Sequence, residues 1–143
     1  MSPHVQVNFG LMAAISNFIE IFSKNVPILL HSNLGNTRFP STTESLIYRI
    51  IKELINNTVK HAKATEIQIV REFINLKLMC DFKDNGIGFN WKEQVESPAK
   101  GMGINNIITR IRSLGGDFEV HSEPNRGFEI SFILQTPIKN AIE

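Results

Sequence analysis

The chain has 143 residues, of which 42% are hydrophobic and 20% are charged. These values are typical of one soluble globular domain and exclude a disordered chain. The formal net charge is +1 at pH 7, which provides no electrostatic reason to expect binding to nucleic acid or to an anionic membrane. The single cysteine, Cys80, has no partner for an internal disulfide, so we expect a small core residue and a reducing, cytoplasmic setting.

The first part of the chain predicts a helix, a short strand and a long second helix. From about Phe9 to Ser23, apolar residues recur at helical spacing. The apolar run 26–34 contains a proline, which favours a strand at an edge of the sheet. From about Thr43 to Ala62 a second apolar stripe marks a long helix. No apolar run approaches the roughly 18 residues of a membrane span, and the N-terminus lacks the basic leader of a secretory signal.

The hydrophobic period then changes from helical to alternating. Ile67 and Ile69 alternate with polar neighbours, and so do residues 76–83. This pattern predicts two strands joined in a hairpin that turns near Ile74–Asn75. The segment 90–100 is polar and irregular, so we expect a mobile loop there.

A third helix and two further strands complete the predicted fold. The helix ends at Gly115–Gly116, and its apolar face is formed by Ile104, Ile107, Ile108, Ile111 and Leu114. The segments 117–122 and 127–135 alternate on either side of the turn EPNRG. Three helices and about five strands, with the helices able to cover only one face, predict an α+β two-layer sandwich.

The second helix carries a group of polar residues that a helix does not need. Glu53, Asn57 and Lys60 fall within an arc of about 60° beside the apolar stripe, and His61 is close to them. A carboxylate, an amide oxygen and an ammonium group on one rim could orient a metal-bound phosphate. The same spacing is also typical of a solvent-exposed helix flank with an i,i+4 ion pair, so the helix alone does not decide.

The segment DNGIGF, residues 84–89, follows the second strand of the hairpin. Asp-Asn-Gly is common turn chemistry. However, Gly86 and Gly88 directly after a buried strand also indicate a backbone that passes close to something flat. Asp84 at the strand end could accept a hydrogen bond from an exocyclic amine, so a turn and a binding site both stay open here.

The segment GMGIN, residues 101–105, opens the third helix. Its glycines leave the backbone N–H groups unobstructed at the positive end of the helix dipole, where phosphate binds readily. It is not the dinucleotide fingerprint, because Asn106 stands where the third glycine would be, and the Walker lysine pattern is absent. A helix start that simply uses glycine is the alternative.

The order of these three motifs is more specific than any one of them. An E-x-x-x-N-x-x-K-H helix, D-x-G-x-G after a strand and G-x-G at a helix start resemble the ATP-binding catalytic domain of bacterial two-component sensor histidine kinases, in its small-lid subfamily. The resemblance covers Phe9 to Pro137. It implies the Bergerat ATP-binding fold of the GHKL superfamily, shared with gyrase and MutL, with a mixed, mostly antiparallel sheet.

The resemblance implies roles for individual residues and implies Mg²⁺ and ATP as cofactors. Asn57 resembles the asparagine that holds Mg²⁺ against the nucleotide phosphates, and Glu53 resembles the acidic residue that orients the attacking imidazole. Asp84 resembles the aspartate that selects adenine, with Gly86 and Gly88 admitting the base. The resemblance also assigns phosphate and lid contacts to Lys60, His61, Gly101, Met102, Gly103 and Ile104.

Two departures from the family pattern stand out. Phe128 follows Gly127 where the family often has a threonine whose hydroxyl helps to bind the adenine region. None of the four histidines lies in a phosphoacceptor motif. We therefore expect residues 1–9 to be the remnant of a connection to a missing dimerisation domain, 10–138 to be the catalytic domain and 139–143 to be a tail.

The resemblance predicts a kinase module that binds Mg·ATP and donates the γ-phosphate to a histidine on its dimerisation domain, and so acts indirectly on a response regulator. The fragment itself is expected to be monomeric and cytoplasmic, without membrane contact, although a full-length parent can be anchored in the inner membrane. Two alternatives are a stand-alone serine kinase of the anti-sigma type and a catalytically degenerate nucleotide-binding interaction module.

Overall fold

The computed structural model describes residues 3–24, 26–35, 37–88 and 104–139. The regular elements follow the predicted order along the chain: α1 (Pro3–Phe22), β1 (Ile28–Ser32), α2 (Ser41–Asn57), the π-helix η1 (Thr58–Ala62), β2 (Ile67–Ile74), β3 (Lys77–Asp84), α4 (Ile104–Ser113), β4 (Asp117–Ser122) and β5 (Phe128–Gln135). None of the described helices combines the length and the apolar character needed to cross a bilayer.

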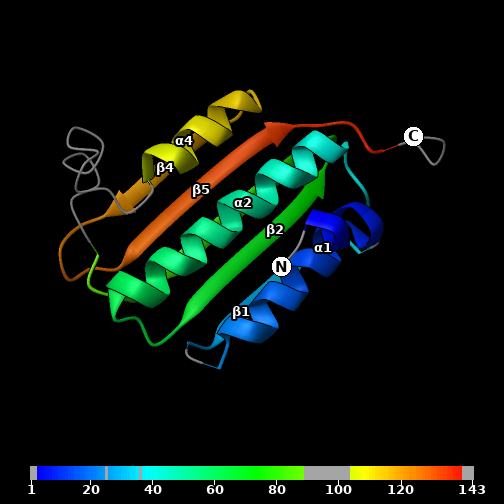
Figure 1. Cartoon of the computed structure of the whole chain (residues 1–143). Helices are drawn as coiled ribbons and strands as arrows, with labels where there is room; N and C mark the ends of the chain where they lie inside the picture. Colours follow the sequence, from blue (N-terminus) through cyan, green and yellow to red (C-terminus); the bar gives the residue numbers. More distant parts are fainter. Residues whose placement is uncertain (1–2, 25, 36, 89–103, 140–143) are drawn as a thin grey trace.

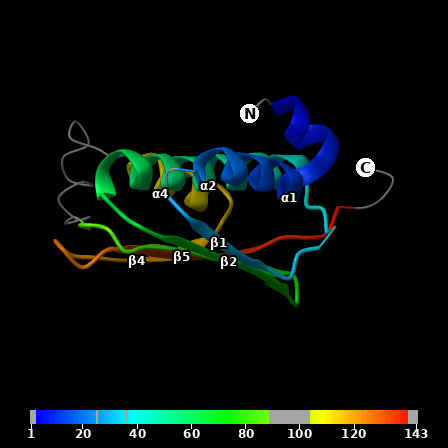
Figure 2. The ribbon, with the colours of Figure 1, turned by 90° about the horizontal axis from the view of Figure 1, so that it is seen from below.

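The five strands form one sheet in the order β1-β2-β3-β5-β4. β1 pairs with β2 in parallel, and the other three pairings are antiparallel, so the predicted mixed and mostly antiparallel sheet is confirmed. β1 lies at an edge, as its proline suggested. Figures 1 and 2 show the helices together on one face of the sheet, which confirms the two-layer sandwich.

Alternation along the strands decides which side chains enter the core between the two layers. On β3 the core-facing residues Leu78, Cys80 and Phe82 are at most 2% exposed, whereas Met79 on the open face is 49% exposed. This is the period of two expected for a sheet covered on one face. Burial raises the pKa of the Cys80 thiol to about 12, so this cysteine is an unreactive core residue, as predicted.

Three element boundaries differ from the sequence-based prediction. The first helix begins at Pro3 instead of about Phe9. The hairpin turns at Asn75 and Leu76, both with positive φ, one residue later than expected. The second helix is α-helical only as far as Asn57 and continues as a π-helix. Periodicity predicts that an element exists more reliably than it predicts where the element ends.

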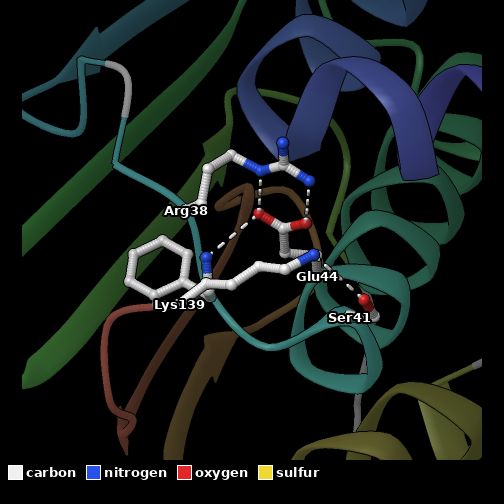
Figure 3. A network of polar contacts seen from close by, with 5 residues as sticks. Arg38, Ser41, Glu44 and Lys139 are labelled. Atoms are coloured by element: carbon white, nitrogen blue, oxygen red, sulfur yellow. Dashed lines mark hydrogen bonds and ion pairs between the residues drawn. The ribbon is translucent and has the colours of Figure 1, made fainter. Parts of the chain in front are cut away.

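A buried ion pair fixes the N-terminal end of α2. Glu44 is 2% exposed and accepts two hydrogen bonds of 3.0 Å from Arg38 Nε and Nη2, as well as one of 3.1 Å from the Phe39 backbone N–H (Figure 3). The Lys139 backbone N–H donates to the Arg38 carbonyl at 2.7 Å. These bonds join the segment before α2 to the segment after β5, and so hold one end of the helix against the sheet.

We expect Glu44→Gln to lower the free energy of unfolding by about 1–3 kcal/mol, because glutamine has one acceptor oxygen where three donors converge. The partial exposure of Arg38 keeps the loss below that of a fully buried pair. Urea denaturation measures the change. The control is Glu119→Gln, at an exposed position on β4, whose free energy of unfolding should stay within about 0.5 kcal/mol of the wild type. Equal stability of both variants would contradict this account.

Candidate functional site

Asp84 is the last residue of β3, and its carboxylate is buried beside the end of the second helix. The residue is 3% exposed. The Thr58 hydroxyl donates to Oδ2 at 2.9 Å, and the Gly86 backbone N–H donates to Oδ1 at 2.8 Å. The Phe128 backbone provides a third hydrogen bond. Burial raises the pKa of Asp84 above the ordinary aspartate value, and the three donors oppose that rise.

The helix that faces Asp84 changes its winding at the contact. Thr58 begins η1, and its backbone N–H is shared between the carbonyls of Leu54 and Ile55. The 60° arc assumed a uniform α-helix and is therefore wrong beyond Asn57, since π-helical i→i+5 turns rotate each residue by less than 100°. Lys60 accordingly lies at a different angle from Asn57 than predicted. π-Helical turns occur frequently at functional sites.

A second set of hydrogen bonds joins the loop after η1 to the loop after β3. Asn85 Oδ1 accepts from the backbone N–H groups of Thr65 at 2.9 Å and Glu66 at 3.0 Å, and Asn85 Nδ2 donates to Thr65 Oγ1 at 2.8 Å. Asn85 thus has the turn role that Asp-Asn-Gly suggested, but it acts across two loops. It fixes the position of Asp84 relative to the helix.

Removing the Asn85 side chain should loosen this connection. For Asn85→Ala we expect a loss of about 1–2 kcal/mol in the free energy of unfolding, the lower part of the range for three hydrogen bonds because the residue is exposed. Thermal denaturation measures it. Asn106→Ala, at an exposed position on α4, is the control, and a similar change in both variants would argue against a specific role for Asn85.

The glycines around Asp84 serve close backbone packing. Gly88 has φ +63°, and a Cβ there would meet the carbonyl oxygens of Glu123 and, at 2.6 Å, Gly127. Gly127 has φ +74°, and its Cβ would lie 2.6 Å from the Asp84 carbonyl oxygen. Both positions therefore require glycine for conformation and for space. The segment after β3 and the turn before β5 therefore lie against each other next to the Asp84 backbone.

Residues 42–138 match the family of histidine kinase-, DNA gyrase B-, and HSP90-like ATPases. The chain belongs to this family. An ATP-binding domain of the predicted class is thereby confirmed.

Curated relatives in the family are sensor kinases. The chain is 29% identical over 133 residues to the sensor histidine kinase ComP of Bacillus subtilis strain 168, and this match covers 90% of this chain and 17% of ComP. It is 30% identical over 134 residues to the histidine-protein kinase/phosphatase DegS of Brevibacillus brevis, and this match covers 92% of this chain and 33% of DegS. The chain thus spans a third or less of the length of these two relatives.

A solved structure supports the fold. The histidine kinase domain of the Erythrobacter litoralis EL346 blue-light activated histidine kinase superposes with a TM-score of 0.71 at 16% identity, over 87% of this chain and 60% of that chain. Its α/β sandwich matches the arrangement in Figure 2.

Besides Asp84, the predicted site residues that the structure describes lie on α2, on η1 and at the start of α4. Glu53 and Asn57 are partly buried on α2, with Asn57 as its last residue, and Lys60 is exposed on η1. Ile104 is the first residue of α4, and its side chain is 2% exposed in the core, so its side chain is not available to a ligand. The side chain of His61 and the whole of Gly101, Met102 and Gly103, like the predicted loop 90–100, lie outside the described residues.

Thr58 is the site residue that the sequence interpretation missed. It lies in the apolar stripe of the second helix and is 3% exposed. Its hydroxyl bonds to a residue 26 positions away. The available signal was a hydroxyl in an otherwise apolar stripe, next to Asn57. Phe128, in contrast, packs its ring 6.4 Å from that of Phe82 and offers Asp84 only its backbone.

Proposed function

We propose that this domain binds Mg·ATP between the end of β3 and the helical segment formed by α2 and η1, and donates the γ-phosphate to a histidine on the dimerisation domain of a two-component sensor kinase. The observation that carries the proposal is the buried Asp84 carboxylate. Within the described part of the chain it forms no ion pair. Its pKa is raised by burial and lowered by three neutral hydrogen-bond donors. A buried charge held in this way is typical of a site that awaits a polar ligand.

Adenine fits this carboxylate better than guanine. The exocyclic amine of adenine donates a hydrogen bond, whereas guanine presents a carbonyl oxygen at that position, which the carboxylate repels. A hydrogen bond to a charged group is worth about 1.5–3 kcal/mol, or roughly 10- to 150-fold in affinity. That difference is large enough to select ATP over GTP.

The magnesium requirement is consistent with the donors available. Mg²⁺ prefers oxygen ligands and usually takes one or two from a protein, together with water and substrate phosphates. Asn57 offers a neutral amide oxygen at the end of α2. No group of three or more His, Cys, Asp or Glu among the described residues could hold a metal by itself, so an ion here would be held jointly with the nucleotide phosphates.

The other residues take supporting roles in this proposal. Glu53, one turn before Asn57, orients the attacking imidazole. Lys60 and His61 contact phosphate, and the backbone at 101–104 holds the phosphates at the start of α4. Catalysis then consists mainly of positioning and charge neutralisation. The acceptor histidine lies on the dimerisation domain, and the response regulator acts after it. Residues 1–9 form the connection to that dimerisation domain, and the catalytic domain lies on the cytoplasmic side.

Calorimetric titration with ATP and GTP, with and without Mg²⁺, tests nucleotide binding. Incubating the domain with labelled ATP and candidate dimerisation domains tests phosphotransfer, with the acceptor histidine replaced by glutamine as the control. An acid-labile phosphoryl group lost in that control supports histidine transfer. An acid-stable group on serine would favour the anti-sigma type of kinase, and ATP binding without transfer to any acceptor would favour a degenerate module.

A further inference from the structure

We propose that Thr58 is a positioning residue for adenine recognition: its hydroxyl fixes the Asp84 carboxylate and joins it to the helix end that carries Asn57. This inference rests on the proposed function and extends it to a residue outside the set of nucleotide ligands. The contact is Thr58 Oγ1 to Asp84 Oδ2 at 2.9 Å, between two residues that are each 3% exposed.

The direction of the Thr58 hydroxyl is informative. A threonine inside a helix commonly bonds to the carbonyl four residues earlier. Here the hydroxyl reaches across to β3 instead, at the residue where α2 gives way to η1. Because Asn57 is the preceding residue, one short connection relates the base-reading group to the predicted metal-binding amide. Movement of the helix end therefore moves the carboxylate as well.

The hydrogen bonds of Asp84 leave room for one further donor. An ionised carboxylate has about four acceptor positions. Of the residues that the structure describes, Gly86, Thr58 and Phe128 donate to three of them. The remaining position is the one to which an exocyclic amine can donate. Since the Phe128 side chain is an apolar ring packed on Phe82, the hydroxyl that holds this carboxylate comes from the helix and not from β5.

The main test is ATP and GTP titration of the whole chain carrying Thr58→Val, which keeps the side-chain shape and removes the hydroxyl. We expect ATP affinity to fall about 5- to 20-fold, less than the loss of a direct hydrogen bond to a charged group would cause, because Thr58 acts through Asp84. The preference for ATP over GTP should also shrink. Thr58→Ser, which retains the hydroxyl, should recover affinity to within about 3-fold of the wild type. Thr136→Val is the matched control, because Thr136 is also 3% exposed but lies beyond the other end of β5.

A pH profile separates hydroxyl loss from a packing defect. The Thr58 hydroxyl stabilises the ionised form of Asp84, so removing it raises the pKa further. ATP affinity of Thr58→Val should then decline at a higher pH than in the wild type, and Thr58→Ser should follow the wild type. The ionisable neighbours on the packed elements do not interfere: Lys83 and Glu129 are on the open face of the sheet, Glu53 is partly buried on α2 and Lys60 is exposed.

Every outcome bears on the proposal. Wild-type affinity and an unchanged pH profile in Thr58→Val would overturn it while leaving the proposed function intact, and so would a Thr58→Ser variant as weak as Thr58→Val. A wild-type chain that binds no adenine nucleotide would remove both proposals together. If Thr58→Val does not fold, Thr58→Ala provides the hydroxyl-free variant, and the same comparisons apply to it.

Discussion

Replacing Asp84 with asparagine should weaken ATP binding about 100-fold while leaving the domain folded. The amide keeps the size of the carboxylate and can still accept from Gly86 and bond to the Thr58 hydroxyl, which donates or accepts. What it loses is the negative charge that makes the hydrogen bond to the adenine amine strong. GTP, which the carboxylate disfavours, should lose much less affinity, so the ratio of the two affinities is the sharper measurement.

Two opposing effects determine the stability of this variant. Because burial raises the pKa of Asp84 in the folded state, the folded chain binds more protons than the unfolded chain between the ordinary and the raised pKa. Stability therefore falls as pH rises through that window, and the ionised carboxylate costs free energy at neutral pH. Asp84→Asn removes this cost. It also leaves one acceptor oxygen where Thr58, Gly86 and Phe128 donate to the carboxylate, although the Thr58 hydroxyl can instead accept from the amide. We therefore expect the melting temperature at pH 7 to stay close to that of the wild type, although the ligand affinity is lower.

The control for Asp84→Asn is Asp81→Asn. Asp81 lies on the same strand but on the open face of the sheet, where its carboxylate accepts from Ser131 Oγ at 2.5 Å. We expect unchanged ATP affinity in Asp81→Asn. Equal losses in both variants would indicate a general charge effect, and wild-type affinity in Asp84→Asn would contradict the assignment of the adenine site. In the wild type, affinity should also decrease as acid protonates Asp84, at a higher pH than for an ordinary aspartate.

The fold was predictable because its signals are local. Period-two alternation identifies β2, β3, β4 and β5, and a single apolar stripe identifies each helix. The boundaries were less predictable: the change from α2 to η1 coincides with a hydrogen bond from Thr58 to another strand, which the local sequence does not show. Arg71 illustrates the same limit: it is a fully buried arginine on the core face of β2 beside Cys80, in a position where alternation predicts an apolar residue.

The site was predictable where spacing alone specifies it and not where it depends on long-range contacts. The three motifs in order single out Asp84 at a strand end and Asn57 within the second helix, whereas the structure shows that the α-helical part ends at Asn57. The roles of Thr58 and Asn85 required knowledge of which loop lies against which, because their partners are 26 and about 20 residues away. Gly88 was predicted to admit a base, whereas the geometry requires glycine at 88, and also at 127, for backbone packing.

Asn57→Ala should abolish the dependence of ATP binding on Mg²⁺. In the proposed function, the amide oxygen of Asn57 is a neutral ligand that helps to hold the ion against the phosphates. Among the described residues, no group of three or more His, Cys, Asp or Glu can hold the ion by itself. We expect Mg²⁺ to increase ATP affinity at least 10-fold in the wild type and less than about 3-fold in the variant. Titration with and without Mg²⁺ measures this, and affinity without Mg²⁺ should be similar in both proteins.

The neighbouring asparagine provides a matched control for this prediction. Asn56 and Asn57 are both partly buried in the last turn of α2, and alanine at either position favours the helix by a few tenths of a kcal/mol. Neither variant should therefore lose stability. The Asn56 side chain points about 100° away from that of Asn57 around the helix. Asn56→Ala should therefore retain the response to Mg²⁺. If Asn57→Ala also retained it, the ion would be held by other groups, and the proposed magnesium role of Asn57 would be contradicted.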